Sequence, residues 1–280
     1  MVELNKLDSL IPMTSCSKEM PYLASTDRHL LLHLHKLGLN FKHYFDVGAS
    51  NGVWSNQVSE DFPEATFDLF EPLVEHAPEY WEKLGPRLTQ HPNFRLHKVA
   101  LGAECKRATL YLYPEPASST VLTTTGQPQA ARPIEVDMLT LDYAIKEFRL
   151  AVPQVLKIDT QGSELMILQG ARDTLPKIEL LLLECWLTRA YGPNTPLFLE
   201  VAQWLRDFGF HLYDLGNPWR DADGTLVAQD CVFLNGRSKA SRLSQEVIHL
   251  SAASQPDQKM LRNRMRNFFF PSGTVSSAKT

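Results

Sequence analysis

The sequence predicts an α/β fold in which helices cover both faces of a mostly parallel β-sheet. Two patterns predict this class. Short apolar stretches of strand length alternate along the chain with longer stretches of helical periodicity. Turn-forming residues, glycine prominent among them, separate the two kinds of stretch. Strands that alternate with helices are typical of a parallel sheet, because each helix carries the chain back across one face.

The first hundred or so residues contain three expected strands, each next to a helix. In the first helix Leu30, Leu31 and Leu34 fall on one face, and Gly38 can end it. The expected elements are a helix over 27–37, a strand over 44–47, a helix over 53–61, a strand over 66–70, a helix over 73–84 and a strand over 94–99.

The alternation breaks between residues 103 and 136. Residues 108–113 alternate between apolar and polar side chains, as an antiparallel strand does, and 133–136 are their expected partner. The stretch between them, 115–132, is rich in Ser, Thr, Gly and Pro and is expected to be a loop. We therefore expect a β-hairpin inserted between the third and fourth strands of the main sheet.

After the insertion the alternation resumes and completes a seven-stranded sheet. The expected elements are a helix over 139–148, a strand over 154–158, a helix over 163–175, a strand over 178–183, a helix from the cap pair Thr195-Pro196 to 208, and strands over 210–214 and 230–234. This domain spans residues 24–236. Residues 1–23 are expected to be irregular, and 237–280 to be a polar, partly disordered extension.

The composition is that of a globular protein. Of the 280 residues 44% are apolar, and the net charge is −4. We expect no nucleic-acid partner, because phosphate binding needs clustered Lys and Arg, and the one such cluster, 262–266, is short. The four cysteines have no C-x-x-C spacing, residues 1–20 lack the apolar core of a secretory signal, and no apolar run could span a membrane. These features favour a cytoplasmic protein.

The chemistry is expected at the strand ends, because open parallel sheets bind ligands outside the carboxyl ends of their strands. The first strand runs into a turn that contains Gly48 and Gly52. The second ends at Glu71, followed by Pro72, where a carboxylate can accept hydrogen bonds from both hydroxyls of a ribose. These two motifs indicate a nucleoside cofactor. They do not separate NAD from S-adenosylmethionine, although the G-x-x-x-G spacing departs from the dinucleotide pattern.

The fourth and fifth strands end in charged residues. Lys157 and Asp159 are two positions apart and so point to the same side of the strand. Glu184 ends the neighbouring strand. A mutual ion pair that fixes the turn would explain Lys157 and Asp159 structurally, whereas three ionisable groups converging on one crevice favour a catalytic role.

Five segments, in order along the chain, resemble those of the FkbM family of methyltransferases. The most specific is LKIDTQGSELMILQGA at 156–171. The others are FDVGASNG at 45–52, FEP at 70–72, VALG at 99–102 and LTLD at 139–142. Ser50 departs from an asparagine common in the family, and the tail from Gly236 matches nothing. The resemblance covers about residues 25–235 and implies a Rossmann-like methyltransferase sheet with S-adenosylmethionine as cofactor.

The resemblance also implies which residues bind the cofactor and what is methylated. The usual acceptor is a hydroxyl of a sugar, glycolipid or secondary metabolite, so we expect a small-molecule or glycan acceptor. Glu71 matches the ribose-binding acid, with Pro72 beside it, and Val99, Ala100 and Leu101 match the segment against the adenine. The expected cofactor loop consists of Asp46, Gly48, Ala49, Asn51 and Gly52.

A hydroxyl is a weak nucleophile, so a general base is expected. Asp159 is the first candidate, with Lys157 orienting it and Glu184 as the alternative; His97 is a weaker one. No metal is assigned, although Asp159, Glu164 and Glu184 could hold a divalent cation.

Acceptor specificity is expected from segments 115–132 and 186–194. Two other classes of protein stay open as alternatives: an NAD-dependent oxidoreductase, and a non-catalytic binding protein that keeps the fold.

Overall fold

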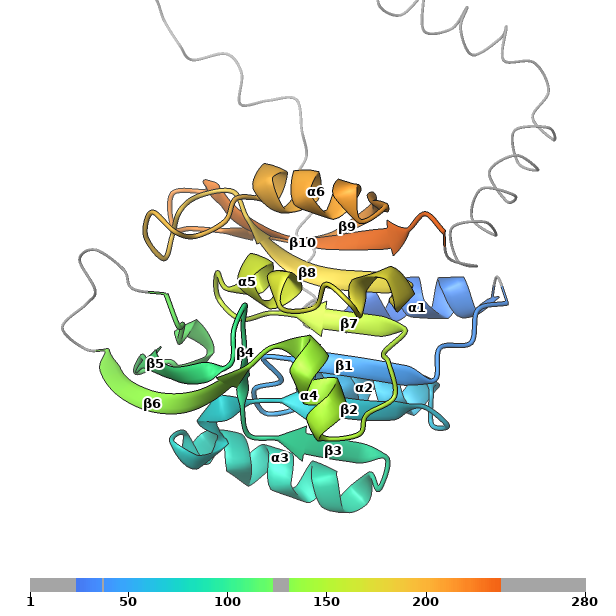
Figure 1. Cartoon of the computed structure of the whole chain (residues 1–280), viewed down its shortest axis with the longest axis horizontal. Helices are drawn as coiled ribbons and strands as arrows, with labels where there is room; N and C mark the ends of the chain where they lie inside the picture. The colour runs from blue at the N-terminus through green and yellow to red at the C-terminus, as the bar shows by residue number, and fades with distance from the viewer. Residues whose placement is uncertain (1–23, 37, 123–130, 238–280) are drawn as a thin grey trace, which may run out of the picture.

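The computed structural model describes residues 24–36, 38–122 and 131–237. The expected irregular segment 1–23 lies outside the described residues, as does the expected polar extension from residue 238 onward. What is described is an α/β domain with a central sheet, helices on both faces and a smaller sheet at one side (Figure 1).

The central sheet has seven strands in the order β3-β2-β1-β7-β8-β10-β9, which confirms the predicted fold class (Figure 1). The strands are β1 (His43–Val47), β2 (Thr66–Phe70), β3 (Phe94–His97), β7 (Val155–Ile158), β8 (Leu180–Trp186), β9 (Phe210–Arg220) and β10 (Leu226–Asn235). All neighbours pair in parallel except β10, which is antiparallel to β8 and β9. The chain builds outward from β1 to β3 and then restarts at β7, so the strand order reverses between β1 and β7.

Each face of the sheet has its own apolar core. One core packs against the face that carries α1 (Ala24–Lys36), α2 (Val53–Asp61) and α3 (Pro78–Gln90). The other packs against α4 (Leu141–Glu147), α5 (Glu164–Gln169) and α6 (Phe198–Asp207). Figure 1 shows α4 and α5 in front of the sheet and α1 and α2 behind it. The strands are therefore buried on both sides, which explains their continuous apolar runs.

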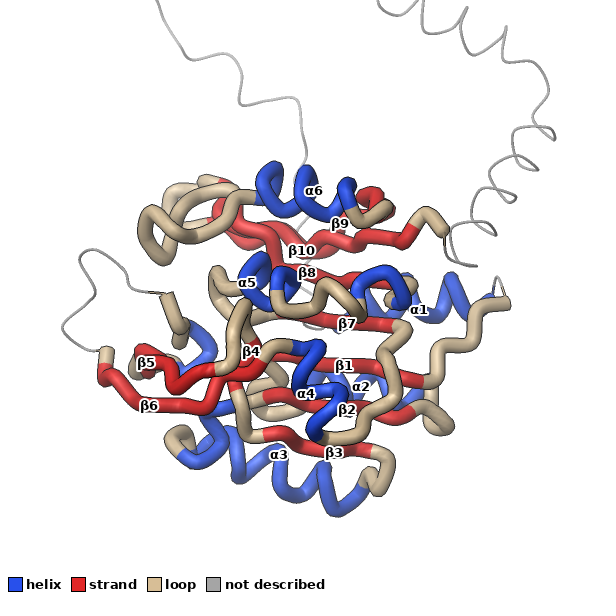
Figure 2. The backbone as a smooth tube through the Cα atoms, viewed as in Figure 1, coloured by secondary structure: helices blue, strands red, loops and turns tan. Residues whose placement is uncertain are grey.

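Between β3 and β7 the chain forms a second, three-stranded sheet. It consists of β4 (Ala100–Leu101), β5 (Lys106–Leu112) and β6 (Arg132–Leu139), and β5 and β6 pair antiparallel where the hairpin was expected. Short 3₁₀ turns, η1 (Pro72–Glu75) and η2 (Pro116–Ser118), lie next to β2 and β5 in the chain. The small sheet stands apart from the main one in Figure 2 and packs against η1 and the start of α3.

Several helices differ from the sequence prediction. The helix expected over 73–84 is η1 followed by α3, because Pro78 opens a new helix at its first position. The helix expected over 163–175 ends at Gln169, and η3 (Leu175–Lys177) follows. Gly170 comes so close to the backbone of Gly102 that an added Cβ would lie 2.0 Å from its carbonyl oxygen.

The start of α6 also differs from the expected cap pair. Thr195 is fully buried, and its hydroxyl accepts a hydrogen bond from the backbone N–H of Tyr191 (3.0 Å) instead of capping a helix. The helix begins at Phe198, and Glu200 accepts a hydrogen bond from the backbone N–H of Leu197 (2.8 Å). Thr195 therefore closes the 191–195 loop.

One residue of the family-like segments has a clear structural role. Asp142, in the first turn of α4, accepts hydrogen bonds from the backbone N–H groups of Asp173 (2.9 Å) and Thr174 (3.0 Å) and from the Thr174 hydroxyl (2.6 Å). The carboxylate thereby ties α4 to the segment that follows α5. It does not line the cavity described below.

We predict that Asp142→Ala lowers the free energy of unfolding by about 1.5–3 kcal/mol, because hydrogen bonds to a charged group are lost and their donors left unpaired. Denaturant unfolding measures the change. Asp207→Asn, which alters an exposed carboxylate at the end of α6, is the control and should change stability by about 0.5 kcal/mol at most. An Asp142→Ala protein as stable as the parent would remove this role.

Candidate active site

A cavity of about 1010 Å³ opens at the carboxyl ends of β1, β2, β7 and β8. This is the side of the sheet where ligands are expected, at the point where the strand order reverses. Of the residues predicted to bind a cofactor, those lining the cavity are Gly48, Ala49, Asn51, Glu71, Pro72, Val99, Ala100 and Leu101; all three predicted catalytic residues, Lys157, Asp159 and Glu184, line it as well.

The loop after β1 is held tightly against its neighbours. Gly48 has a φ of 74°, and an added Cβ would lie 1.9 Å from the carbonyl oxygen of Asp159, so only glycine fits there. Ser50 also takes a left-handed conformation, with a φ of 52°. The position that departs from the family pattern is thus one where asparagine is favoured over other non-glycine residues.

Gly52 does not line the cavity, although it was predicted to bind the cofactor. Its φ of 75° makes it the left-handed residue that starts α2. Its backbone N–H donates to Ala49 (2.7 Å), and the next N–H, of Val53, donates to the Asn51 side chain (3.1 Å). Two of the N–H groups at the start of α2 are therefore bonded within its own loop.

Glu71 is buried at the end of β2, with 4% of its surface exposed. Its carboxylate accepts hydrogen bonds from the backbone N–H groups of Ser50 (2.7 Å) and Leu73 (2.9 Å). Burial nevertheless raises the pKa of Glu71 to about 7, because these two bonds only partly offset the loss of hydration. Each oxygen keeps a second lone-pair site, so the side chain can still accept hydrogen bonds from a ligand.

Lys157 and Asp46 form an ion pair between the two central strands. They stand opposite each other in the β1–β7 register, with 3.1 Å between Nζ and Oδ1. Asp46 is 1% exposed, accepts a second hydrogen bond from the Ser55 hydroxyl (2.8 Å) and does not line the cavity. Asp46 was expected to belong to the cofactor loop; its carboxylate is hydrogen-bonded to Lys157 and Ser55.

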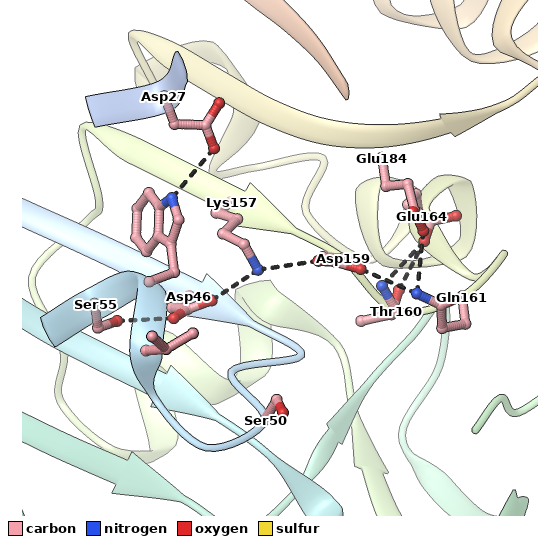
Figure 3. Close-up of polar contacts among 12 residues, drawn as sticks. Asp27, Asp46, Ser50, Ser55, Lys157, Asp159, Thr160, Gln161, Glu164 and Glu184 are labelled. Carbon is pink, nitrogen blue, oxygen red and sulfur yellow. Dashed lines mark hydrogen bonds and ion pairs between the residues drawn. The ribbon is translucent and has the colours of Figure 1, made fainter. Parts of the chain in front are cut away.

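The Lys157 ammonium also lies 3.6 Å from Asp159 Oδ2 and 5.8 Å from the centre of the Trp54 ring. Burial lowers the pKa of Lys157, but Asp46 and Asp159 outweigh burial and the net shift is upward, so the side chain stays charged. The expected Lys157–Asp159 pairing is present, but it is longer than the contact with Asp46, and Asp159 keeps 42% of its side chain exposed. Figure 3 shows this row of contacts from Ser55 to Asp159.

Gln161 connects the two candidate bases. Its side-chain N–H₂ donates to Asp159 (3.2 Å) and to Glu184 (3.1 Å) (Figure 3). Its side-chain carbonyl accepts from the Tyr191 hydroxyl (2.6 Å). Its backbone carbonyl accepts from the Thr120 hydroxyl (2.8 Å). Both segments expected to set acceptor specificity, 115–132 and 186–194, therefore reach this residue.

Two residues named in the sequence prediction do not line the cavity. Glu164 accepts from the backbone N–H groups of Thr160 and Gly162, both at 3.1 Å, and fixes the turn after β7. It is not among the lining residues, and among the described residues no three His, Cys, Asp or Glu side chains are placed to hold a metal ion. His97 hydrogen-bonds Asp68 (2.8 Å) and stacks between Phe70 and Phe148.

Comparison with known families decides the relationship. The model of the methyltransferase FkbM domain matches residues 46–212, more than half of the chain. The chain belongs to the FkbM methyltransferase family. The match begins at Asp46 and contains every predicted site residue. No curated protein matches the sequence.

Solved structures with a similar fold include three methyltransferases. FkbM methyltransferase from Methylobacillus flagellatus is 17% identical, with a TM-score of 0.45 over 70% of this chain and 44% of that one. The 1,6-didemethyltoxoflavin N1-methyltransferase of Burkholderia thailandensis, solved with S-adenosylhomocysteine, is 13% identical with a TM-score of 0.40, covering 76% and 78% of the chains. An N-methyltransferase from Bradyrhizobium japonicum is 9% identical with a TM-score of 0.42, covering 75% and 95%. The chain thus spans less than half the length of the first of these.

This FkbM-family domain has further cavity residues that the sequence did not indicate. Asp27 of α1 accepts a hydrogen bond from the Trp54 indole (3.2 Å), and Asp230 of β10 stands opposite Glu184 in the strand register. Both lie outside the range that the family model matches. Neither has a motif around it, and only the packing of α1 and the pairing of β8 with β10 bring them to the site.

Within the described part of the chain, no helix is long and apolar enough to cross a membrane.

The carboxyl groups at this end of the sheet raise one another's pKa. Burial raises the pKa of Glu184 well above its usual range, and Asp159 and Glu164 add to the shift. The pKa of Asp230 rises to about 7, through burial and the charges of Asp27 and Asp159, and that of Asp27 to about 6, chiefly through burial. Without a ligand, ionising these groups therefore destabilises the fold.

We predict that Asp230→Asn stabilises the ligand-free protein, and more so at higher pH. Because the folded-state pKa is raised from 3.8 to about 7, the parent loses stability as pH rises between these values. Asparagine lacks this titration, so its advantage should grow over that range to about 1–2 kcal/mol, reduced from the full shift by solvent screening. Denaturant unfolding at several pH values measures it, with Asp207→Asn as the control. A difference independent of pH would contradict the assignment.

Proposed function

We propose that the chain is an S-adenosylmethionine-dependent methyltransferase that methylates a hydroxyl group of a small-molecule or glycan acceptor. The observation that carries the proposal is the shared cavity: the buried carboxylate of Glu71 and the Asp159–Glu184 pair, from three strand ends, line one space. A nucleoside at Glu71 would thus lie beside two candidate bases. Family membership supports the reaction type, and the resemblance described above supports the hydroxyl acceptor.

The cavity residues fit this cofactor. Glu71 offers free lone pairs for the two ribose hydroxyls, while Val99 and Leu101 give an apolar lining suited to a purine ring. Two N–H groups at the start of α2, those of Gly52 and Val53, are already bonded within the loop, which argues against NAD because a pyrophosphate is usually bound by free N–H groups at that position. S-adenosylmethionine has no phosphate and does not need them. Sites for one ligand span roughly 300–1,000 Å³, so a cavity of about 1010 Å³ is large enough for cofactor and acceptor groups together.

When bound, S-adenosylmethionine would supply an already activated methyl group, so the protein's task is alignment, exclusion of water and removal of one proton. Asp159 is the proposed base. One of its carboxylate oxygens takes the proton of the acceptor hydroxyl while the oxygen of that hydroxyl gains the methyl group. Lys157 and Gln161 hold the two oxygens of Asp159 at 3.6 and 3.2 Å. Glu184 is the less suitable base, since its raised pKa leaves it protonated more of the time.

We predict that Glu71→Gln weakens binding of S-adenosylmethionine and removes the part of its pH dependence that Glu71 causes. A charge-assisted hydrogen bond contributes about 1.5–3 kcal/mol, so affinity should fall about ten- to a hundredfold at pH 8. In the parent, a carboxyl with a pKa of about 7 must ionise to accept both hydroxyls, so affinity should be about tenfold higher at pH 8 than at pH 6.

Isothermal titration of both proteins at the two pH values measures this prediction. Any titration of the cofactor itself is common to parent and variant, so the difference between them reports Glu71. Glu79→Gln, a second carboxyl residue that lines the cavity, is the matched control. Equal affinity of parent and Glu71→Gln would contradict the ribose assignment, and tighter binding of NAD than of S-adenosylmethionine would contradict the proposed function.

We predict that Asp159→Asn slows methyl transfer by about 10²–10⁴ while leaving cofactor affinity within about threefold of the parent, because loss of a general base affects the chemical step. The acceptor is first found by radiolabelled-methyl transfer into extracts, followed by mass spectrometry of the product. Turnover and cofactor affinity are then measured on one preparation. If Asp159→Asn turns over normally and Glu184→Gln does not, the base is Glu184.

A further inference from the structure

One part of the cavity is not explained by the cofactor. Beyond Glu184 it is lined by three aromatic side chains, Trp186, Tyr191 and Trp219. The Trp186 ring is perpendicular or nearly so to both others, at 90° to Tyr191 with 5.0 Å between ring centres, and at 78° to Trp219 with 5.8 Å. Trp219 is 52% exposed, so a large apolar ring is kept at the cavity instead of in the core. Rings in this arrangement can contact a ligand from more than one side.

Acidic side chains surround the cavity. The lining residues that carry a carboxyl group are Asp27, Glu71, Glu79, Glu115, Asp159, Glu184 and Asp230; the lining lysines are Lys83 and Lys157. Lys157 is already held by Asp46 and Asp159. The two carboxyl groups at the aromatic end, Glu184 and Asp230, have no cationic side chain of the described chain beside them in an ion pair. A bound cation would therefore stabilise their ionised form, whereas an anionic ligand would gain no partner here.

One residue at this end of the cavity, Trp186, has a hydrogen-bond donor without a partner among the described residues. The indole N–H of Trp186 is buried, with the residue 2% exposed, and has no hydrogen-bond partner among the described residues. A buried donor without a partner costs about 1–3 kcal/mol, so a ligand oxygen that accepts this bond would stabilise the site. The ligand should then present an oxygen to Trp186 and a cation to the carboxylates.

We propose that this end of the cavity binds a protonated amine of the acceptor, and hence that the acceptor is an amino alcohol or amino sugar. The ammonium group donates to Glu184 and Asp230 and lies against the aromatic rings, which attract cations. Gln161 contacts both Glu184 and Asp159, at 3.1 and 3.2 Å, so an acceptor whose amine is held by Glu184 has a neighbouring hydroxyl close to Asp159. This inference rests on the proposed function, because it names the acceptor of that same site.

The test compares two probes of nearly the same shape, trans-2-aminocyclohexanol and trans-2-methylcyclohexanol, which differ by an ammonium in place of a methyl group. Each is titrated into the full chain saturated with S-adenosylhomocysteine. We expect the amine to bind at least about tenfold more tightly, the effect of one charge-assisted hydrogen bond. The preference should fall to about twofold or less in a Glu184→Gln/Asp230→Asn double variant. It should remain in Asp207→Asn, which removes an exposed carboxylate outside the cavity.

A Trp219→Leu variant gives a second test that does not depend on the double variant folding, because Trp219 is half exposed. It should weaken binding of the amine about three- to tenfold by removing an aromatic face, and leave binding of the neutral probe less affected. Equal affinity of the parent for the two probes, a preference that survives in the double variant, or no binding of either probe would overturn the inference. Failure of S-adenosylhomocysteine to bind would instead contradict the proposed cofactor, and the probe preference is then measured without it.

Discussion

The buried ion pair between Lys157 and Asp46 is the interaction on which the site depends. It joins β1 and β7, the two strands between which the strand order reverses, at the edge where the cavity opens. A buried charge is tolerated only when it is paired and hydrogen-bonded. Here the pairing is completed by the Ser55 hydroxyl from α2 and the face of the Trp54 ring. The ion pair therefore fixes β1, β7 and α2 relative to one another before any ligand is bound.

Fixing these elements also fixes what faces the cavity. The loop after β1 packs closely against the loop after β7, since an added Cβ on Gly48 would lie 1.9 Å from the carbonyl oxygen of Asp159. The Lys157 ammonium lies near the carboxylate of Asp159, and Asp46, which does not line the cavity, forms the closer ion pair with Lys157. Several carboxyl groups lie around Lys157, and burial, together with repulsion among these groups, raises the pKa of Glu184 and Asp230. These carboxyl groups lower the stability of the ligand-free protein, and the same groups can bind a positively charged ligand. Lower stability of this kind is common at functional sites.

The sequence was sufficient for the features that depend on local pattern. Alternating strands and helices predicted the sheet, and polar residues at strand ends predicted Glu71, Asp159 and Glu184 at one cavity. It could not predict contacts set by strand register. Asp46 and Lys157 are 111 positions apart, and nothing in either motif says that they stand opposite each other. The same holds for Asp230, which reaches Glu184 only because β10 enters antiparallel between β8 and β9.

The prediction of helix ends from the sequence was wrong for a related reason. The periodicity after residue 163 continues past Gln169, but the contact of Gly170 with Gly102, a residue far away in the sequence, accompanies the end of α5 there. Tertiary contacts of this kind override local propensity. Sequence reasoning also missed Gln161, because a glutamine beside a conspicuous aspartate carries no charge of its own and acts only through the groups that it joins.

Gln161 is also where base position and acceptor specificity meet. Its φ of 58° is unusual for a residue with a side chain and persists only where the surroundings enforce it. Thr120 holds its backbone carbonyl, and Tyr191 holds its side-chain carbonyl, so each oxygen of Gln161 is bound by a different acceptor-facing segment. The orientation in which Gln161 donates to Asp159 and Glu184 therefore depends on both segments. A change in either one that admits a new acceptor also moves the group that positions the base, so in this fold the choice of acceptor and the placement of the base cannot vary independently.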